Sequence, residues 1–172
     1  PNRNRAAGYA KGDFVMYVDS DDVLFDYTIE KYVSYLDDFP SLNFIIYCDA
    51  KELGEIPKMM ESGEIILSHF FKKSYLQSGP GGMFIRKDFF DSIGRIPEKY
   101  GPANDTYFNI KAASKSNVLI NPMVPLYYRI HDNQESNNHF SYIYNNYRFN
   151  RDVISDLILP LTPGQKKIIL KK

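Results

Sequence analysis

Hydrophobic and polar residues follow one another along the chain in segments typical of an α/β protein. Two continuous hydrophobic runs, 14–18 and 44–48, have the composition of strands buried on both faces. Residues 27–38 show helical spacing until Pro40 ends the pattern. The expected packed side of that helix holds Ile29, Tyr32, Val33 and Leu36. Strands that alternate with helices predict a largely parallel or mixed sheet between helices, with ligands bound beyond the strand carboxyl ends.

The other expected elements are shorter. Further helices are expected over 3–11, 67–76, 87–93, 105–116, 140–159 and 164–172, and further strands over 83–85, 117–121 and 124–129. The residues around 61–64 read as a polar loop, and 79–82 (Gly-Pro-Gly-Gly) as a turn.

Composition narrows the range of functions. The 172 residues suit one hydrophobic core, and Lys+Arg and Asp+Glu both number 21, so no net charge favours nucleic acid as a partner. Cys48 is the one cysteine, which excludes an intrachain disulfide and fits a cytoplasmic setting. The sequence has no hydrophobic run of about 18 residues that would span a membrane.

The sharpest chemical feature is an acidic cluster directly after the first hydrophobic run. Asp19, Asp21 and Asp22 place three carboxylates within four residues, and these repel one another unless a cation lies among them. A hard divalent cation takes oxygen ligands and leaves positions for substrate phosphates. The cluster therefore predicts a Mg²⁺ or Mn²⁺ site, with a solvated turn that caps the next helix as the alternative.

Two enzyme classes use such a cluster, and the motif by itself does not choose between them. In a phosphatase of the haloacid dehalogenase type, Asp19 would attack phosphorus and Asp21 would act as acid and base. In a glycosyltransferase, the carboxylates would hold a metal on a diphosphate leaving group.

The residues around the cluster resemble glycosyltransferase family 2. Arg3, Asn4, Ala10 and Gly12 lead into the strand and Asp-Ser-Asp-Asp at the family's spacing, although Ala6 stands where glycine is more usual. Residues 81–94 resemble the family's glycine loop, short strand and Ile-Gly helix end. Residues 127–131 (Tyr-Tyr-Arg-Ile-His) resemble the end of its catalytic region. The three motifs cover residues 3–131 in the family's order.

This resemblance implies a GT-A-like α/β fold with a mixed sheet flanked by helices. The family's first strand-helix-strand unit is absent, and the chain does not begin with Met, so we expect an N-terminally truncated sequence. The expected division is a partial GT-A catalytic domain over 1–135 and a C-terminal helical extension over 136–172.

The resemblance also implies an inverting transfer of a sugar from a nucleoside diphosphate, expected to be UDP, to an acceptor hydroxyl. Asp105 is then the base, although Asn104 stands before it where the family usually has Glu, and the helix dipole is expected to keep Asp105 ionised. Asp21 and His131 are the expected ligands of Mn²⁺ or Mg²⁺. The expected donor-binding residues are Arg3, Asn4, Asp19, Asp21, Asp22, Gly81 and Gly82, with the two glycines allowing the sugar to approach the backbone.

The expected partners are a nucleotide-sugar donor and a glycan or lipid-linked acceptor, and the expected process is bacterial cell-surface polysaccharide synthesis. The lysine-rich segment 166–172 predicts either a solvated helix end or a peripheral contact with the inner face of the plasma membrane. A non-catalytic fragment that binds sugar nucleotides remains an alternative to the enzyme.

Overall fold

The computed structural model describes residues 2–49, 54–130 and 139–171. The α-helices are α1 (Asn2–Tyr9), α2 (Thr28–Asp38), α3 (Ser62–Phe71), α4 (Lys87–Ser92), α5 (Asn104–Ala113), α6 (His139–Asp156) and α7 (Pro163–Ile169). The strands are β1 (Phe14–Met16), β2 (Val23–Leu24), β3 (Phe44–Tyr47), β4 (Lys58–Met60), β5 (Met83–Arg86), β6 (Val118–Asn121) and β7 (Leu126–Tyr127). Two 3₁₀ turns, η2 (Pro80–Gly82) and η3 (Gly101–Ala103), precede β5 and α5.

Five strands form the main sheet in the order β1-β5-β3-β6-β4, and β2 pairs with β7 in a separate two-stranded sheet. Among the strands that the structure describes, only β3 and β6 run parallel to each other, whereas β1–β5, β3–β5 and β4–β6 are antiparallel pairs. The sheet is therefore mixed, as expected, and most of its pairs are antiparallel.

The direction of β5 determines which loops meet. Because β5 lies between β1 and β3 and runs against both, it enters the sheet at the edge where they leave it. Met16 pairs with Phe84, and Ile46 pairs with Met83, so the acidic turn after β1 and the end of β3 both lie near η2. This edge is the one at which the candidate site is built.

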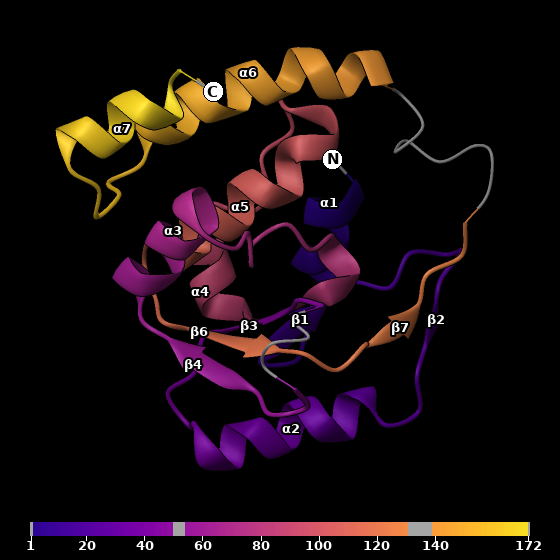
Figure 1. Cartoon of the computed structure of the whole chain (residues 1–172). Coiled ribbons are helices and arrows are strands. Elements are labelled where there is room, and N and C mark those ends of the chain that lie inside the picture. Colours follow the sequence, from indigo (N-terminus) through magenta and orange to yellow (C-terminus); the bar gives the residue numbers. More distant parts are fainter. Residues whose placement is uncertain (1, 50–53, 131–138, 172) are drawn as a thin grey trace.

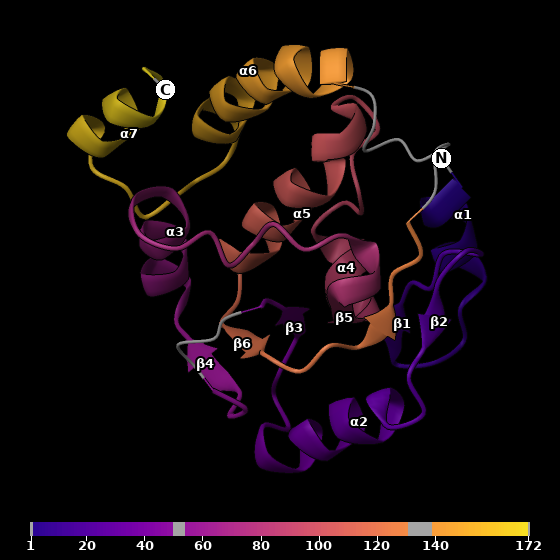
Figure 2. The same ribbon diagram turned by 45° about the vertical axis from the view of Figure 1, so that its right-hand side comes forward.

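Helix α2 covers one face of the sheet, and α3, α4 and α5 cover the other (Figures 1 and 2). Strand residues alternate between the two faces, as the two-residue period of a strand requires. On the α2 side, Ile45, Phe84 and Leu119 pack with Tyr32 and Leu42 in one cluster.

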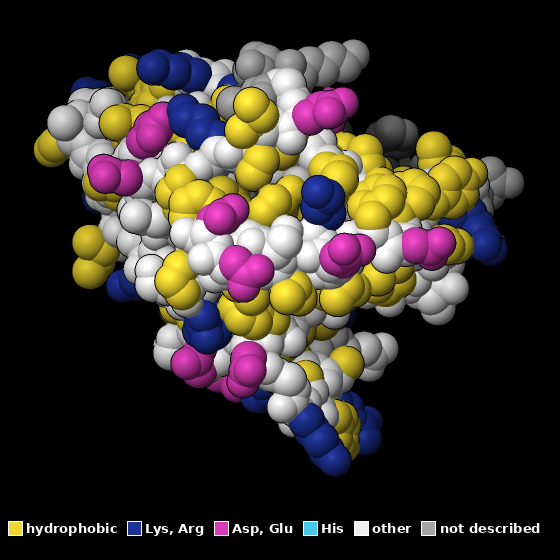
Figure 3. All heavy atoms as spheres, turned by 90° about the horizontal axis from the view of Figure 1, so that it is seen from below, with side chains coloured by type: hydrophobic (Ala, Val, Ile, Leu, Met, Phe, Trp, Pro, Cys, Tyr) yellow, Lys and Arg dark blue, Asp and Glu magenta, His cyan; other side chains and the backbone are white. Residues whose placement is uncertain are grey.

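The buried side of α2 differs from the predicted one. Tyr32 is fully buried, but Ile29 and Val33 are 46% and 50% exposed. Leu36 packs against the same cluster, as predicted, and Tyr35 does so in place of Ile29 and Val33. Hydrophobic side chains consequently remain visible among carboxylates on the face that α2 forms, seen from below in Figure 3.

The larger cluster lies on the other face and continues outward to α6 and α7. Phe149, Val153 and Ile154 of α6 and Ile169 of α7 belong to the same cluster as the sheet residue Ile46. Helices α6 and α7 form an outer layer over α3 and α5 (Figures 1 and 2). No described helix is both long and apolar enough to cross a membrane.

Three local expectations were wrong. Helix α3 begins at Ser62 and includes the segment read as a polar loop, because Glu64 lies in its exposed first turn and pairs with Lys58. Strands β4 and β2 were missed because they are three and two residues long, whereas β7 lies within the strand expected over 124–129 and is shorter than expected. Hydrophobic patterns over so few residues carry no readable period.

A charged cluster fastens α6 to the segment before α5. Asp152 is 7% exposed and accepts hydrogen bonds from Lys99 Nζ and Tyr100 Oη, both at 3.0 Å, and from Arg151 Nε at 2.9 Å. Burial raises the pKa of Asp152, but the hydrogen bonds from Arg151, Lys99 and Tyr100 outweigh it and lower the pKa to about 2. The carboxylate is therefore stabilised in its charged form.

We predict that Asp152→Asn lowers the free energy of unfolding at pH 7 by about 2 kcal/mol, because charge-assisted hydrogen bonds are lost at a buried position. Since the folded pKa is depressed, the difference between wild type and variant should shrink as the pH falls from about 4 through 2. Urea denaturation at several pH values measures both effects.

Asp156→Asn is the matched control, because Asp156 is 3.9 Å from the same Lys99 and its side chain is 47% exposed. This variant should change stability by less than about 0.5 kcal/mol. Equal losses in the two variants would contradict the role given to Asp152.

Candidate active site at the end of the first strand

The acidic cluster forms a tight turn at the end of β1. The backbone N–H of Asp22 donates to the carbonyl of Asp19 at 3.0 Å, which closes the turn. Asp19, Asp21 and Asp22 are all partly buried. Asp19 and Asp22 line a pocket of about 400 Å³, here called the strand-end pocket, and Asp21 is not among its lining residues.

All three segments that carry the family resemblance meet at this pocket. Pairing of β2 with β7 places Val23 opposite Tyr127, and Asp22 Oδ1 accepts the backbone N–H of Arg129 at 3.2 Å. The glycine segment supplies the opposite wall through η2. The full lining comprises Asp19, Asp22, Phe25, Tyr47, residues 78–82 and residues 124–128.

Sequence reasoning missed several of these residues. Tyr47 ends β3 and enters the pocket because β3 leaves the sheet beside η2. Its position at the end of a hydrophobic run was the available signal. Phe25 and Ser78 have no comparable signal, because they reach the pocket through the short β2–β7 pairing and an irregular segment.

Arg3 links the acidic turn to Asp105 across about a hundred residues of sequence. Its Nη2 donates to Asp19 Oδ2 at 2.8 Å, and its Nη1 lies 3.7 Å from Asp105 Oδ1. Arg3 and Asp19 also line a second pocket of about 390 Å³ together with Asn104, so Asp19 borders both pockets. The predicted base and the predicted donor site are therefore brought together.

Asp105 lies in the first turn of α5 with its side chain 17% exposed. Burial raises its pKa to about 6, the Arg3 charge opposes this, and the Asp19 charge adds to it. The expectation that the helix dipole keeps Asp105 ionised stays a prediction, and burial is an effect that acts against the charged form. Oδ1 is buried and accepts no hydrogen bond from the described residues, since the 3.7 Å contact is too long for one.

Asn4 has a structural contact that explains how Arg3 is positioned. Its Oδ1 accepts the N–H of Ile96 at 3.1 Å, and its Nδ2 donates to the Ile96 carbonyl at 2.7 Å. Arg95 Nη1 also donates to the Asn4 carbonyl at 3.0 Å. These contacts fasten α1 to the segment after α4, and Arg3 is thereby held over Asp19.

Both glycines lie against neighbouring side chains of the protein itself, and the contacts are tighter at Gly82. A Cβ on Gly81 would lie 2.5 Å from Leu126 Cδ2, and one on Gly82 would collide with the side chain of Ser78 and lie 3.2 Å from Tyr47 Cβ. The space that they leave free is filled by neighbouring side chains. Their predicted role in donor binding stays a prediction.

The acidic turn is the predicted site of a divalent cation. Among residues 2–49, 54–130 and 139–171, no three His, Cys, Asp or Glu side chains converge as a metal cluster. Asp19 accepts a hydrogen bond from Arg3, and Asp22 accepts one from the backbone N–H of Arg129. A cation that shares substrate phosphates needs only one or two carboxylates, so the turn fits such a shared site. His131 lies outside the described residues.

Replacement of Gly82 tests the tight packing at η2. We predict that Gly82→Ala lowers the free energy of unfolding by about 1–3 kcal/mol, because the methyl group overpacks the contact with Ser78 and Tyr47. Gly79→Ala is the matched control in the same segment, since its Cβ would meet nothing within 4 Å. The free energy of unfolding of Gly79→Ala should equal that of wild type or exceed it by about 0.4–1 kcal/mol. Thermal or urea unfolding of both variants measures the difference.

The raised pKa of Asp105 makes its charge a cost to folding at neutral pH. An unfolded Asp has a pKa of about 3.9, so the folded chain binds the proton of Asp105 more tightly than the unfolded chain does. Protonation of Asp105 therefore stabilises the folded state. This stabilisation is fully present below pH 4 and is lost as the pH rises through 6. Asp105→Asn should therefore be more stable than wild type by about 2 kcal/mol at pH 8 and no more stable at pH 4.

Denaturation in urea at both pH values measures this difference. Asp26→Asn, at an exposed carboxylate, should change stability by less than about 0.5 kcal/mol at either pH. A loss of stability in Asp105→Asn at pH 8 would show that Arg3 outweighs burial.

Solved structures with a similar fold include those of the S. aureus protein TarS. TarS 1-349 in complex with UDP-GlcNAc matches with a TM-score of 0.73 at 19% identity, covering 98% of this chain and 49% of that one. TarS 1-349 in complex with UDP gives 0.68 at 19% identity, with 98% and 48% covered. At this identity the likeness shows the fold, a GT-A-type mixed sheet flanked by helices, and this chain spans about half the length of those relatives.

No curated protein sequence matches the chain. The model of glycosyl transferase family 2 matches residues 1–94, which is more than half of the 172 residues and contains Arg3, the acidic turn and the glycine segment. The chain therefore belongs to glycosyltransferase family 2.

Proposed function

We propose that this chain transfers a sugar from a nucleoside-diphosphate donor, a UDP-sugar, to an acceptor hydroxyl with inversion at the anomeric carbon. The observation that carries the proposal is the position of Asp105. Its buried Oδ1, without a hydrogen-bond donor among the described residues, lies 3.7 Å from the arginine that also holds Asp19 of the acidic turn. These contacts support a role for Asp105 as a base close to a candidate donor site.

The donor proposal rests on the fold and on the strand-end pocket. TarS, the similar fold, is known in complexes with UDP-GlcNAc and with UDP. In this chain the pocket has aromatic walls at Tyr47 and Tyr127 and carboxylates at Asp19 and Asp22. Aromatic rings suit a nucleobase or sugar face, and carboxylates accept hydrogen bonds from ribose hydroxyls or hold a cation on the diphosphate.

The proposed reaction needs a proton acceptor and a leaving group. Asp105 takes the proton of the acceptor hydroxyl, whose oxygen forms a bond to the anomeric carbon as the bond to the diphosphate breaks and UDP leaves. A carboxyl with a pKa near 6 is charged at neutral pH and more basic than an ordinary aspartate. Arg3 would keep the carboxylate oriented, and Asn4 would keep Arg3 in place.

We also propose Asp21, with Asp22, as the protein's ligands for Mn²⁺ or Mg²⁺, and His131 as a further ligand. A divalent cation in this position neutralises the charge that develops on the departing diphosphate. The phosphatase alternative is less well supported, because Asp19 is ion-paired with Arg3 and the chain belongs to a glycosyltransferase family.

The acceptor is proposed to be a glycan or lipid-linked sugar, with the enzyme in the cytoplasm of a bacterium that builds surface polysaccharide. Helix α7 offers one supporting feature for a peripheral membrane contact. Ile168 is 52% exposed and Leu170 49%, and both lie beside Lys166, Lys167 and Lys171. Exposed apolar residues flanked by lysines suit an anionic interface.

Calorimetric titration with UDP tests the donor site. We predict that UDP binds the wild-type chain in the presence of Mn²⁺ and at least about tenfold more weakly with EDTA, because the cation offsets repulsion between diphosphate and carboxylates. Asp21→Ala should remove most of the Mn²⁺ dependence.

Two variants serve as controls for that titration. Asp26→Ala removes an exposed carboxylate close in sequence and should leave the UDP affinity and its metal dependence unchanged. Asp105→Asn should also bind UDP within about twofold of wild type, because the proposed base faces the acceptor. A UDP affinity of wild type that does not depend on metal, or an equal loss of metal dependence in Asp26→Ala, would contradict the assignment of Asp21. If the chain bound no nucleoside diphosphate, the proposed function would be wrong.

A further inference from the structure

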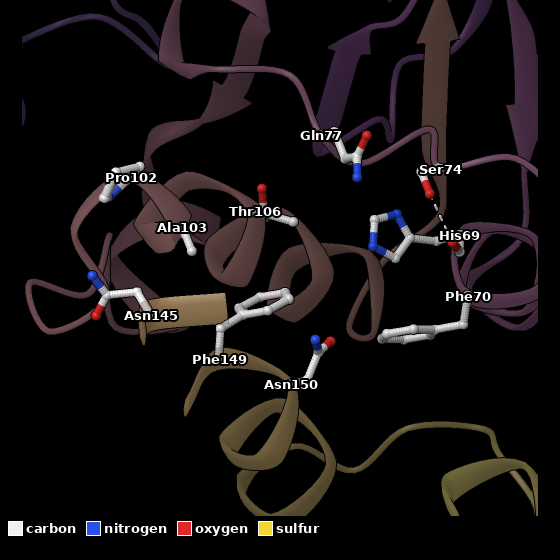
Figure 4. Close-up of a pocket in the computed structure, with 10 residues that line it drawn as sticks. All are labelled: His69, Phe70, Ser74, Gln77, Pro102, Ala103, Thr106, Asn145, Phe149 and Asn150. Carbon is white, nitrogen blue, oxygen red and sulfur yellow. Dashed lines mark hydrogen bonds between the residues drawn. The ribbon is translucent and has the colours of Figure 1, made fainter. Parts of the chain in front are cut away.

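A third pocket, here called the His69 pocket, lies between α3, α5 and α6 and has a volume of about 540 Å³. None of the residues that the resemblance singled out lines it. Its lining consists of His69, Phe70, Ser74, Gln77, Pro102, Ala103, Thr106, Asn145, Phe149 and Asn150 (Figure 4). The volume lies within the range of pockets that bind small molecules.

The chemistry of the lining is polar but uncharged. Three amides and two hydroxyls, of Gln77, Asn145, Asn150, Ser74 and Thr106, stand among the rings of Phe70 and Phe149. None of the described lining residues is a Lys, Arg, Asp or Glu. Amides and hydroxyls both donate and accept hydrogen bonds, and aromatic rings pack on the apolar face of a sugar ring.

His69 supplies an unsatisfied group at this pocket. The residue is 8% exposed, and its Nδ1 is buried without a hydrogen-bond partner in the described part of the chain. Burial lowers the pKa of His69 to about 4, so the imidazole is neutral at pH 7. Its ring extends from α3 toward the space bounded by Gln77, Thr106 and Phe149 (Figure 4). A neutral imidazole there offers one donor and one acceptor.

The His69 pocket shares two elements with the candidate active site. Thr106 follows Asp105 on α5, so the two side chains diverge by about 100° around the helix axis, one toward this pocket and one toward Arg3. Gln77 lines the His69 pocket, and the next residue, Ser78, lines the strand-end pocket. The segment 76–78 therefore separates the two cavities.

The separating segment is held in place from α5. Asn109 is fully buried, and its Nδ2 donates to the carbonyls of Leu76 at 3.1 Å and Ser78 at 2.9 Å. The helix that presents Asp105 thus also fixes the wall between the cavities.

We infer that the His69 pocket is an acceptor subsite that binds an uncharged sugar residue of the acceptor glycan. This inference rests on the proposed function. A diphosphate is disfavoured there because the described lining has no cation to neutralise it, whereas carboxylates that can hold one line the strand-end pocket. A lipid chain is disfavoured because it would leave His69 Nδ1 without a partner and place hydrocarbon against a lining of polar side chains.

NMR titration with neutral sugars tests the inference. The probes are cellobiose and N-acetylglucosamine, and glucuronic acid is the charged comparison. We expect saturable shifts of the His69 ring and of the side-chain amides of Gln77, Asn145 and Asn150, with millimolar affinity for a neutral probe. These shifts should persist when UDP and Mn²⁺ are present, because donor and acceptor bind together.

Two substitutions on separate helices make the result specific to the pocket. Thr106→Val keeps the shape of the side chain and removes its hydroxyl, and Asn150→Leu removes an amide. Each substitution should lower the affinity for the neutral probe by about fivefold or more, which is the effect of losing one hydrogen bond. Both variants should bind UDP like wild type. Because the two residues lie on α5 and α6, a folding defect in one variant leaves the other as the test.

The alternative outcomes are distinct. Three results would each overturn the inference and leave the proposed function intact. They are the absence of saturable shifts while UDP still binds, an unchanged affinity for the probe in both variants, and a preference for glucuronic acid. Displacement of the neutral probe by UDP would overturn the acceptor assignment. Probe binding without any UDP binding would support a sugar site while removing the proposed function.

Discussion

The antiparallel course of β5 between β1 and β3 is the constraint on which the candidate site depends. A strand that runs against both neighbours brings the loop before it to the edge where both neighbours end. The glycine segment, the acidic turn and Tyr47 meet there for this reason alone. An all-parallel sheet would have placed the glycine segment at the opposite edge, far from the carboxylates. The close packing at Gly82 follows from the crowding of three chain segments at this edge.

The charges of Arg3, Asp19 and Asp105 are the second constraint on the candidate site. Asp105 and Asp19 are like charges held near one another, and Arg3 lies between them with one nitrogen toward each. Without that guanidinium, burial and the neighbouring carboxylate would both act to keep Asp105 protonated. Helix α1 therefore acts on the site from outside the sheet, through a side chain that Asn4 holds in position by its contacts with Ile96.

How much of this the sequence predicts depends on the length of each pattern. Helices α2, α5 and α6 follow from helical spacing, β3 and β6 from hydrophobic runs, and the acidic turn from its composition. The alternation of strands with helices and the family resemblance both allowed for the mixed sheet. The two-residue strand β2 carries no period, so its pairing with β7 and the contact of Asp22 with Arg129 could not be predicted. The ion pair between Arg3 and Asp105 joins residues that only the tertiary fold brings together. Their charges were visible in the sequence, but their separation was not.

Asn109 has a mechanical consequence. Because both of its hydrogen bonds run from α5 to the strip of backbone at Leu76 and Ser78, that strip cannot shift without the helix. Asp105 and Thr106 lie on the same helix, α5. A small rotation of α5 would consequently alter the openings on both sides of the strip and the direction of the carboxylate in a single movement. The relative alignment of two bound molecules would then be governed by one degree of freedom, so that neither could be repositioned independently of the other.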